Sequence, residues 1–202
     1  MNCALRTCVY AAHTVFFIFS QGFVSFAKGD KGHSIVVNNG TFPRPASSDE
    51  FQWNEHSKLT WNDFRGPVKA ATEESAAAMH CGIGFTTTTG SPGGKLQITV
   101  YNTFYTNRSW VRPDTKIPEL LNHEQGHFDL CEIYTRKLRR QMSNFNFDVV
   151  DVRSVLMSIY TKFQDEYESR QQAYELETVH GTNIVVQKRW QDMITKKLSV
   201  GI

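Results

Sequence analysis

Two histidines, His123 and His127, lie four residues apart in the segment HEQGH, and Glu124 directly follows the first of them. On an α-helix each residue turns by about 100°, so the two imidazoles point about 40° apart and can reach one metal ion. Glu124 would then lie beside the ion, where a carboxylate can take a proton from a zinc-activated water. The spacing predicts a zinc site in which Glu124 is the general base of a hydrolytic reaction.

The third zinc ligand must come from elsewhere, because a catalytic zinc usually takes three protein ligands and keeps its fourth position for water. Asp129 and Glu132 follow closely, but on a continuing helix both point away from His123. No glycine follows His127 before them that could break the helix and return a ligand to the metal. We therefore interpret both residues as structural.

Three residues further along the chain remain open as the third ligand. Glu166 and Glu168 lie at a separation used by sites with two histidines and one glutamate, although the charged run QDEYESRQQ around them is typical of a solvated face. His180 lies just before Gly181, where a histidine also commonly interacts with the dipole of a helix end. The residues alone do not choose among these candidates.

The elements that must position this site form two groups along the chain. Segments 77–89 and 95–105 are rich in β-branched and aromatic residues and flank the turn GSPGG, which predicts an antiparallel hairpin. A shorter β-like segment is expected over 58–67. Helices are expected from Pro118 through the histidines, from about Val149 to Gly181, and over 185–198. Strands followed by helices predict an α+β fold, with a small antiparallel β-sheet and a zincin-like helical part that carries the HExxH helix.

The start of the chain has the features of an export signal. A weakly positive beginning is followed by the apolar stretch CVYAAHTVFFIFS and by small residues at Ser25 and Ala27. We expect a signal peptide over residues 1–27, a flexible lead-in over 28–54, and a single zinc metallopeptidase-like domain over 55–202. The apolar stretch is short for a membrane span, so the mature protein is expected to be secreted or periplasmic, without stable membrane insertion after cleavage.

Composition excludes one class of partner and leaves one question open. The formal net charge is +2 and no long run of Lys or Arg is present, so nucleic acid is not an expected partner. Cys3 and Cys8 would leave with the signal peptide. Cys81 and Cys131 would remain, either as one disulfide or as two buried thiols.

Three blocks of the sequence resemble a known bacterial family of predicted secreted zinc-dependent proteases, long catalogued as a domain of unknown function. The blocks are LTWNDFRGP, HEQGHFD and YELETVHG, and the resemblance spans Leu59 to Trp190. In the last block the resemblance implies His180 as the third zinc ligand. Glu175 stands where the family pattern more often has aspartate. Asp129 fits the family motif as a partner of a ligand, a role that helix geometry also favours over direct ligation.

We therefore expect a secreted zinc-dependent metallopeptidase, with peptide or protein as substrate and Zn²⁺ as cofactor. Its metal ligands would be His123, His127 and His180, and Glu124 would be catalytic. Glu166, Glu168 and Glu175 are the alternatives to His180 as the third ligand. One alternative is a secreted binding module whose structural zinc is closed by a fourth ligand such as Glu166 or Glu175. Another is a zinc amidase that acts on cell-wall peptides. Candidates for supporting a ligand or an oxyanion are Asp129, Tyr174, Glu175 and Thr178.

Overall fold

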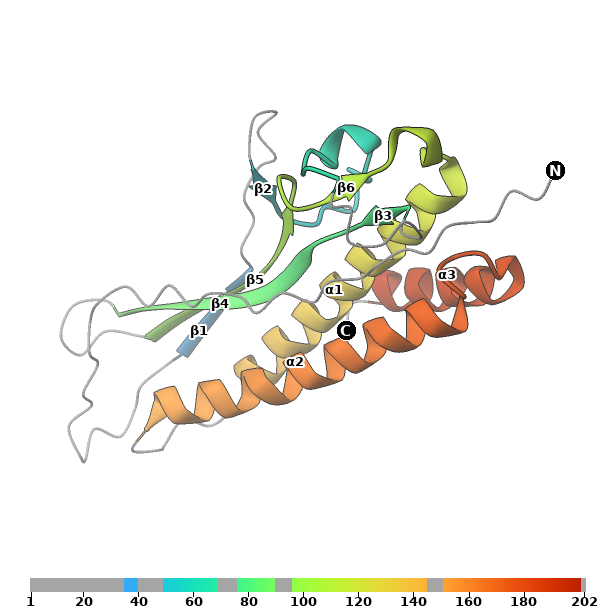
Figure 1. The fold of residues 1–202 in the computed structure, drawn as a ribbon. Coiled ribbons are helices and arrows are strands. Elements are labelled where there is room, and N and C mark those ends of the chain that lie inside the picture. The colour runs from blue at the N-terminus through green and yellow to red at the C-terminus, as the bar shows by residue number, and fades with distance from the viewer. Residues whose placement is uncertain (1–34, 40–48, 69–75, 90–95, 145–150, 201–202) are drawn as a thin grey trace.

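The computed structural model describes residues 35–39, 49–68, 76–89, 96–144 and 151–200. The expected signal peptide lies outside these ranges. Within them the chain is α+β, with strands before helices (Figure 1). This confirms the fold class predicted from the sequence.

A long antiparallel hairpin forms the main sheet. Strand β4 (Cys81–Thr89) pairs with β5 (Leu96–Tyr105), so that Cys81 lies opposite Phe104 and Thr89 opposite Leu96. Along the first half of β5, Leu96, Ile98 and Val100 are buried, while the residues between them are more exposed. This alternation gives the sheet one apolar face, against which a helix can pack. The hairpin predicted from the sequence is confirmed.

Two strands from the expected lead-in complete the other edge of β5. Strand β1 (Ile35–Asn39) runs parallel to the start of β5, and β2 (Glu50–Phe51) runs antiparallel to its end. The structure therefore differs from the predicted flexible lead-in at these residues. Both pairings join segments far apart in sequence, so local Gly, Ser and Asn content does not indicate them.

The β-like segment expected over 58–67 instead contains a 3₁₀ helix, η1 (Trp61–Asp63). The Oδ2 atom of Asp63 accepts hydrogen bonds from the backbone N–H of Thr60 at 2.7 Å and from its hydroxyl at 3.0 Å. These local bonds favour a helical turn over a strand. The remaining short elements are β3 (Ala77–Ala78), which pairs with β6 (Trp110–Val111), and the 3₁₀ helix η2 (Pro113–Thr115).

Helix α1 (Pro118–Asn144) lies at the centre of the molecule. It contacts β1, β4 and β5 as well as α2 (Val152–Glu177) and α3 (Ile184–Ser199). Figure 1 shows α2 running back along α1. Helix α3 lies beside the end of α2 and packs against α1. Every residue of α1 from His123 to Thr135 is buried, as expected for a helix covered on all sides.

Aromatic rings in stacked and edge-on contacts hold α1 against the sheet. Phe104 of β5 lies between Phe51 of β2 and Phe128 of α1, with ring centroids 4.9 Å and 5.5 Å away, and Phe64 contacts Phe104 at 5.5 Å. Such pairs contribute about 0.5–1.5 kcal/mol each beyond the area they bury. Phe128 directly follows His127, so this packing also fixes the position of the histidine segment.

Cys81 and Cys131 are buried free thiols. Burial and, to a smaller extent, a hydrogen bond with Cys81 raise the pKa of the Cys131 thiol.

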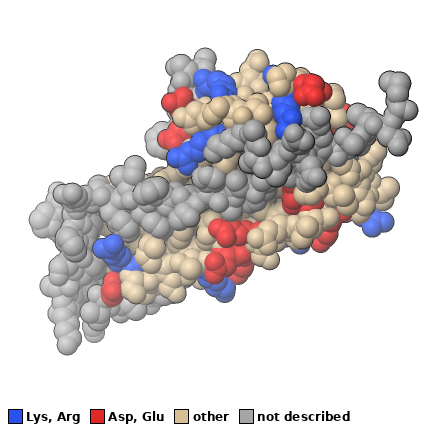
Figure 2. Space-filling view, viewed as in Figure 1, with Lys and Arg blue, Asp and Glu red and all other residues tan. Residues whose placement is uncertain are grey.

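None of the helices in the described ranges is long and apolar enough to cross a membrane. On the face shown in Figure 2, acidic side chains gather over the middle of α2, with basic side chains beside them.

Candidate metal centre

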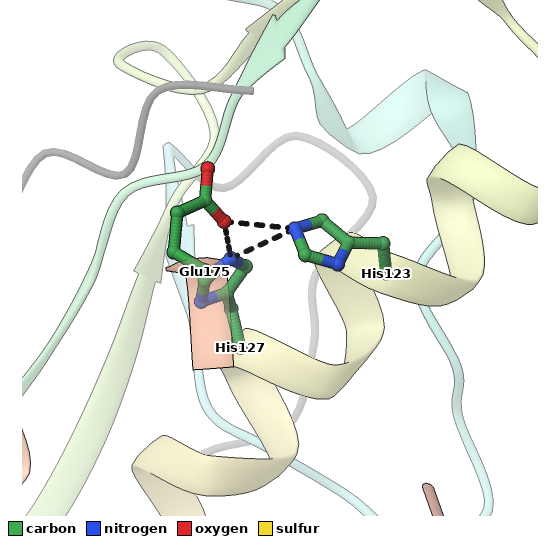
Figure 3. Close-up of side chains that lie close together, drawn as sticks. All are labelled: His123, His127 and Glu175. Carbon is green, nitrogen blue, oxygen red and sulfur yellow. Dashed lines mark hydrogen bonds and ion pairs between the residues drawn. The ribbon is translucent and has the colours of Figure 1, made fainter. Parts of the chain in front are cut away.

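Three donor atoms converge between α1 and α2. The Nε2 atoms of His123 and His127 are 3.2 Å apart, and Oε2 of Glu175 lies 2.9 Å from the first and 3.0 Å from the second. Figure 3 shows the three side chains pointing toward one another, the two histidines from α1 and the glutamate from α2. His123, His127 and Glu175 form a cluster that could hold a metal ion.

Helix geometry explains how these residues meet. The four-residue spacing places His123 and His127 on successive turns of the same face of α1. Helix α2 runs back along α1, so its last turn, which carries Glu175, returns to the level of the histidines. Residues 48 positions apart in sequence thus become neighbours.

The cluster is deeply buried, and Glu175 is anionic within it. His123 and His127 are 0% and 1% exposed, and Glu175 is 8% exposed. Burial raises the pKa of the Glu175 carboxyl, but hydrogen bonds and charge from the two histidines outweigh this and hold the pKa well below its usual value. A buried carboxylate requires positive charge close by.

Two glutamines contact the opposite nitrogens of the histidine rings. Oε1 of Gln187, on α3, lies 3.1 Å from Nδ1 of His123, and Oε1 of Gln171, on α2, lies 2.6 Å from Nδ1 of His127. The sequence analysis missed both. Gln171 lies one helical turn before Glu175, and Gln187 shares a face with the buried Trp190 and Ile194. A polar residue on a buried helix face is the pattern that could have indicated them.

Tyr174 packs directly against both histidines. Its ring stacks on His123 with centroids 4.8 Å apart and meets His127 edge-on at 4.7 Å. Its hydroxyl donates to the backbone carbonyl of His123 at 3.1 Å. Burial raises the pKa of the Tyr174 hydroxyl far above its usual value, so it keeps its proton. Tyr174 therefore supports the cluster through stacking and one backbone hydrogen bond.

The turn after α2 has an unusual backbone. Val179, His180 and Gly181 are all in the left-handed region, with φ of 50°, 56° and 79°. Thr178 stabilises the turn, since its hydroxyl donates to the carbonyl of Tyr174 at 2.6 Å and accepts from the N–H of Gly181 at 3.2 Å. A Cβ on Gly181 would lie 2.9 Å from Cγ of His123, so this glycine allows the turn to pack on the ring.

His180, the third ligand implied by the resemblance, is placed differently from that expectation. It is outside the cluster of donor atoms. Its Nδ1 instead lies 2.5 Å from Oε1 of Glu175, and its side chain is 29% exposed. The physical reason is the left-handed turn, which brings His180 to the outer oxygen of Glu175 while the inner oxygen faces the two histidines.

The other acidic candidates also lie outside the cluster. Oδ1 of Asp129 accepts from Nε1 of Trp53 at 2.6 Å and from Gln125 at 2.7 Å, so its described hydrogen bonds anchor another segment and do not support a histidine. Glu132 pairs with Arg136 at 2.8 Å, which agrees with its structural interpretation. On α2, Glu166 is exposed, and Glu168 accepts from a neighbouring glutamine.

Glu124 is 1% exposed on α1, next to the first histidine of the cluster. Its charge contributes to the raised pKa of Tyr174, whose ring packs on both histidines. The predicted base is thus part of the same buried region.

The donor set fits a divalent metal. Two imidazole nitrogens and one carboxylate oxygen are ligands that zinc takes in catalytic sites with three protein ligands. The three atoms lie within 3.2 Å of one another in a buried position, so that a single positive ion could contact all of them.

The fold and this cluster define an α+β domain with a possible two-histidine, one-glutamate metal centre. Residues 63–181 match a family described as bacterial protein of unknown function (DUF922), and the chain belongs to this family. The match covers more than half of the chain and all three residues of the cluster. No curated protein and no solved structure matches the chain.

Proposed function

We propose that this protein is an exported, zinc-dependent metallopeptidase in which His123, His127 and Glu175 hold the metal. The observation that carries the proposal is the convergence of the two Nε2 atoms and one Oε2 atom within 3.2 Å of one another in a buried position. The resemblance of the sequence to predicted secreted proteases supports the same function.

Zinc, when bound, supplies Lewis acidity that polarises a scissile carbonyl and acidifies water. The protein supplies the other parts. Glu124 takes the proton of the attacking water and passes it to the leaving amine. Glu175 is the most exposed of the three ligands, with 10% of its side chain exposed, and the His180 side chain beside it is 29% exposed. A peptide substrate would reach the cluster from that side.

The number of donors favours catalysis over a purely structural metal. Structural zinc sites are closed by four protein ligands, whereas catalytic sites keep one position open. Three residues of the described chain form the cluster, and His180 contacts the outer oxygen of Glu175 instead of joining them. An amidase that acts on cell-wall peptides would use the same residues and differ in its substrate.

Metal content and peptide hydrolysis of the mature protein test the proposal, with the variant Glu124→Gln. We expect this variant to bind zinc as the wild type does and to lose at least about 10²-fold in kcat, because only the proton acceptor is removed. The matched control is Glu132→Gln, a second buried glutamate of α1, which pairs with Arg136 and should keep full activity.

Two outcomes would contradict the proposal. If the wild type binds no zinc under conditions in which it is folded, the metal assignment is wrong. If Glu124→Gln hydrolyses peptides as fast as the wild type, Glu124 is not the base.

A further inference from the structure

The orientation of the Gln171 and Gln187 amides is fixed by the hydrogen bonds that their Nε2 atoms donate. The Nε2 atom of Gln171 donates to the backbone carbonyl of His127 at 2.9 Å, so its Oε1 faces the His127 ring. The Nε2 atom of Gln187 donates to the Tyr174 hydroxyl at 2.7 Å. That hydroxyl already gives its proton to the carbonyl of His123, so it can only accept from Gln187. Both amides are therefore assigned by their networks.

An amide oxygen can only accept a hydrogen bond, so the ring nitrogen that faces it must carry the proton. We infer that Gln171 and Gln187 are positioning residues that hold a proton on Nδ1 of His127 and of His123 before any metal binds, so that Nε2 is the nitrogen left to bind it. In the metal-free protein each Nε2 lies within hydrogen-bond distance of Oε2 of Glu175, and it would give up any proton it carries there when an ion binds. The inference rests on the proposed function in taking zinc as the ion that these atoms receive.

The two glutamines come from different helices, so their contacts with the histidine rings form only when the helices pack together. Gln171 reaches His127 from α2, and Gln187 reaches His123 from α3. Gln171 is 0% exposed and Gln187 is 7% exposed, so water does not readily replace either amide. A neutral imidazole can otherwise carry its proton on either nitrogen, and the partner of one nitrogen decides which form is present. Partners of this kind commonly change metal affinity by about 10–100-fold when removed.

Nitrogen-15 NMR of the metal-free protein measures the tautomers directly. We expect His123 and His127 to carry a proton on Nδ1 in the wild type, whether or not Nε2 is also protonated. In Gln187→Met the lock on His123 is lost, so its proton should redistribute toward Nε2, and zinc affinity measured by chelator competition should fall about 10–100-fold. Gln171→Met should do the same at His127.

The variant Gln187→Glu separates the acceptor role from simple packing. Its carboxylate still accepts from Nδ1 but has lost the amide donor, and the Tyr174 hydroxyl can donate to it instead. We expect Gln187→Glu to keep the Nδ1–H tautomer and to bind zinc far more tightly than Gln187→Met. Gln125→Met is the control, because the amide of Gln125 hydrogen-bonds the backbone N–H of Leu59 and the carboxylate of Asp129. It should leave tautomers and zinc affinity unchanged.

The inference is overturned if Nδ1 of either histidine carries no proton in the folded metal-free wild type, or if Gln187→Glu binds zinc as weakly as Gln187→Met. These results are distinguishable from failure of the proposed function. A wild type with both Nδ1–H tautomers but no zinc binding or hydrolysis would leave the inference intact and remove the proposed enzyme.

Discussion

Glu175 uses its two carboxylate oxygens for different partners. Oε2 faces His123 and His127, whereas Oε1 contacts Nδ1 of His180. In the proposed site this division leaves one oxygen for the metal and engages the other, so Glu175 binds through a single atom. His180 then acts by holding the ligand in place, a role that needs no direct contact with zinc.

The variants Glu175→Ala and His180→Ala should therefore differ in zinc affinity. His180→Ala removes a partner of a ligand and should weaken zinc binding by about 10–100-fold. Glu175→Ala removes the only anionic donor of the cluster and should weaken binding by more than that range. Isothermal titration with zinc measures both. The reverse order of affinities would make His180 the ligand, as the resemblance implies.

At this scale the sequence could predict only what local spacing determines. His123 and His127 follow from helical periodicity, and so does the exclusion of Asp129 and Glu132 from the cluster. The partners on α2 and α3 depend on how the helices pack, which a motif in one helix does not specify. Glu175 was recognised from the sequence as a supporting residue, as a fourth ligand, and as one of three glutamates that were alternatives to His180.

At the scale of elements, the contact between α1 and α2 depends on Gly126. A Cβ at this position would lie 2.2 Å from the hydroxyl oxygen of Tyr174, an impossible contact unless the helices separate. Alanine would gain about 0.5–1 kcal/mol in helix propensity, but overpacking costs about 1–3 kcal/mol. The steric cost is the larger.

We thus expect Gly126→Ala to lower the free energy of unfolding and to weaken zinc binding, because Glu175 and Gln171 move with Tyr174. Denaturant unfolding and zinc titration measure the two effects. The control is Gly84→Ala on β4, whose Cβ would meet only the ring end of Tyr101, at 3.0 Å. This ring is partly exposed and can move aside. Equal effects of the two substitutions would contradict the argument.

The turn between α2 and α3 stores strain next to the cluster. Val179 is β-branched and has φ of 50°, a conformation that such residues rarely adopt and that costs about 1–3 kcal/mol. Its side chain is 51% exposed, so little packing is lost on substitution. The strain is tolerated because the same turn places His180 against Glu175.

Replacing this residue by asparagine, which tolerates the left-handed region, should raise the free energy of unfolding by about 1 kcal/mol without weakening zinc binding. Val185→Asn, at an exposed position in the first turn of α3, is the control and should give no such gain. Chemical denaturation measures both variants. A Val179→Asn protein no more stable than the wild type would mean that the turn is unstrained.

Elements with strong local patterns were predicted well. The hairpin of β4 and β5 and the start of α1 at Pro118 follow from turn residues and periodicity. Strand β1 and the 3₁₀ helix η1 were not predicted. The first depends on a parallel pairing with a distant strand, and the second on two hydrogen bonds between Thr60 and Asp63.

At the scale of the whole molecule, the cluster joins the parts of the fold that contact α1. Its histidines belong to the central helix, its carboxylate to α2, and the Gln187 amide that orients one ring belongs to α3. Since these three helices meet only in the folded chain, a metal bound there stabilises the native state relative to the unfolded state.

Zinc should therefore raise the Tm of the protein, and a chelator should reverse the increase. At free zinc about 1,000 times the Kd the stabilisation is about 4 kcal/mol, which corresponds to roughly 10 °C for a domain of this size. Because protons compete with the metal for the nitrogen and carboxylate donors, the zinc-dependent increase should shrink as the pH is lowered. Differential scanning calorimetry with and without zinc at several pH values measures this increase in Tm.

Glu175→Ala should show little of the zinc-dependent increase in Tm at the same zinc concentration. Glu132→Gln should show all of it, since Glu132 lies outside the cluster. An equal rise of Tm in Glu175→Ala would mean that zinc stabilises the protein from another site.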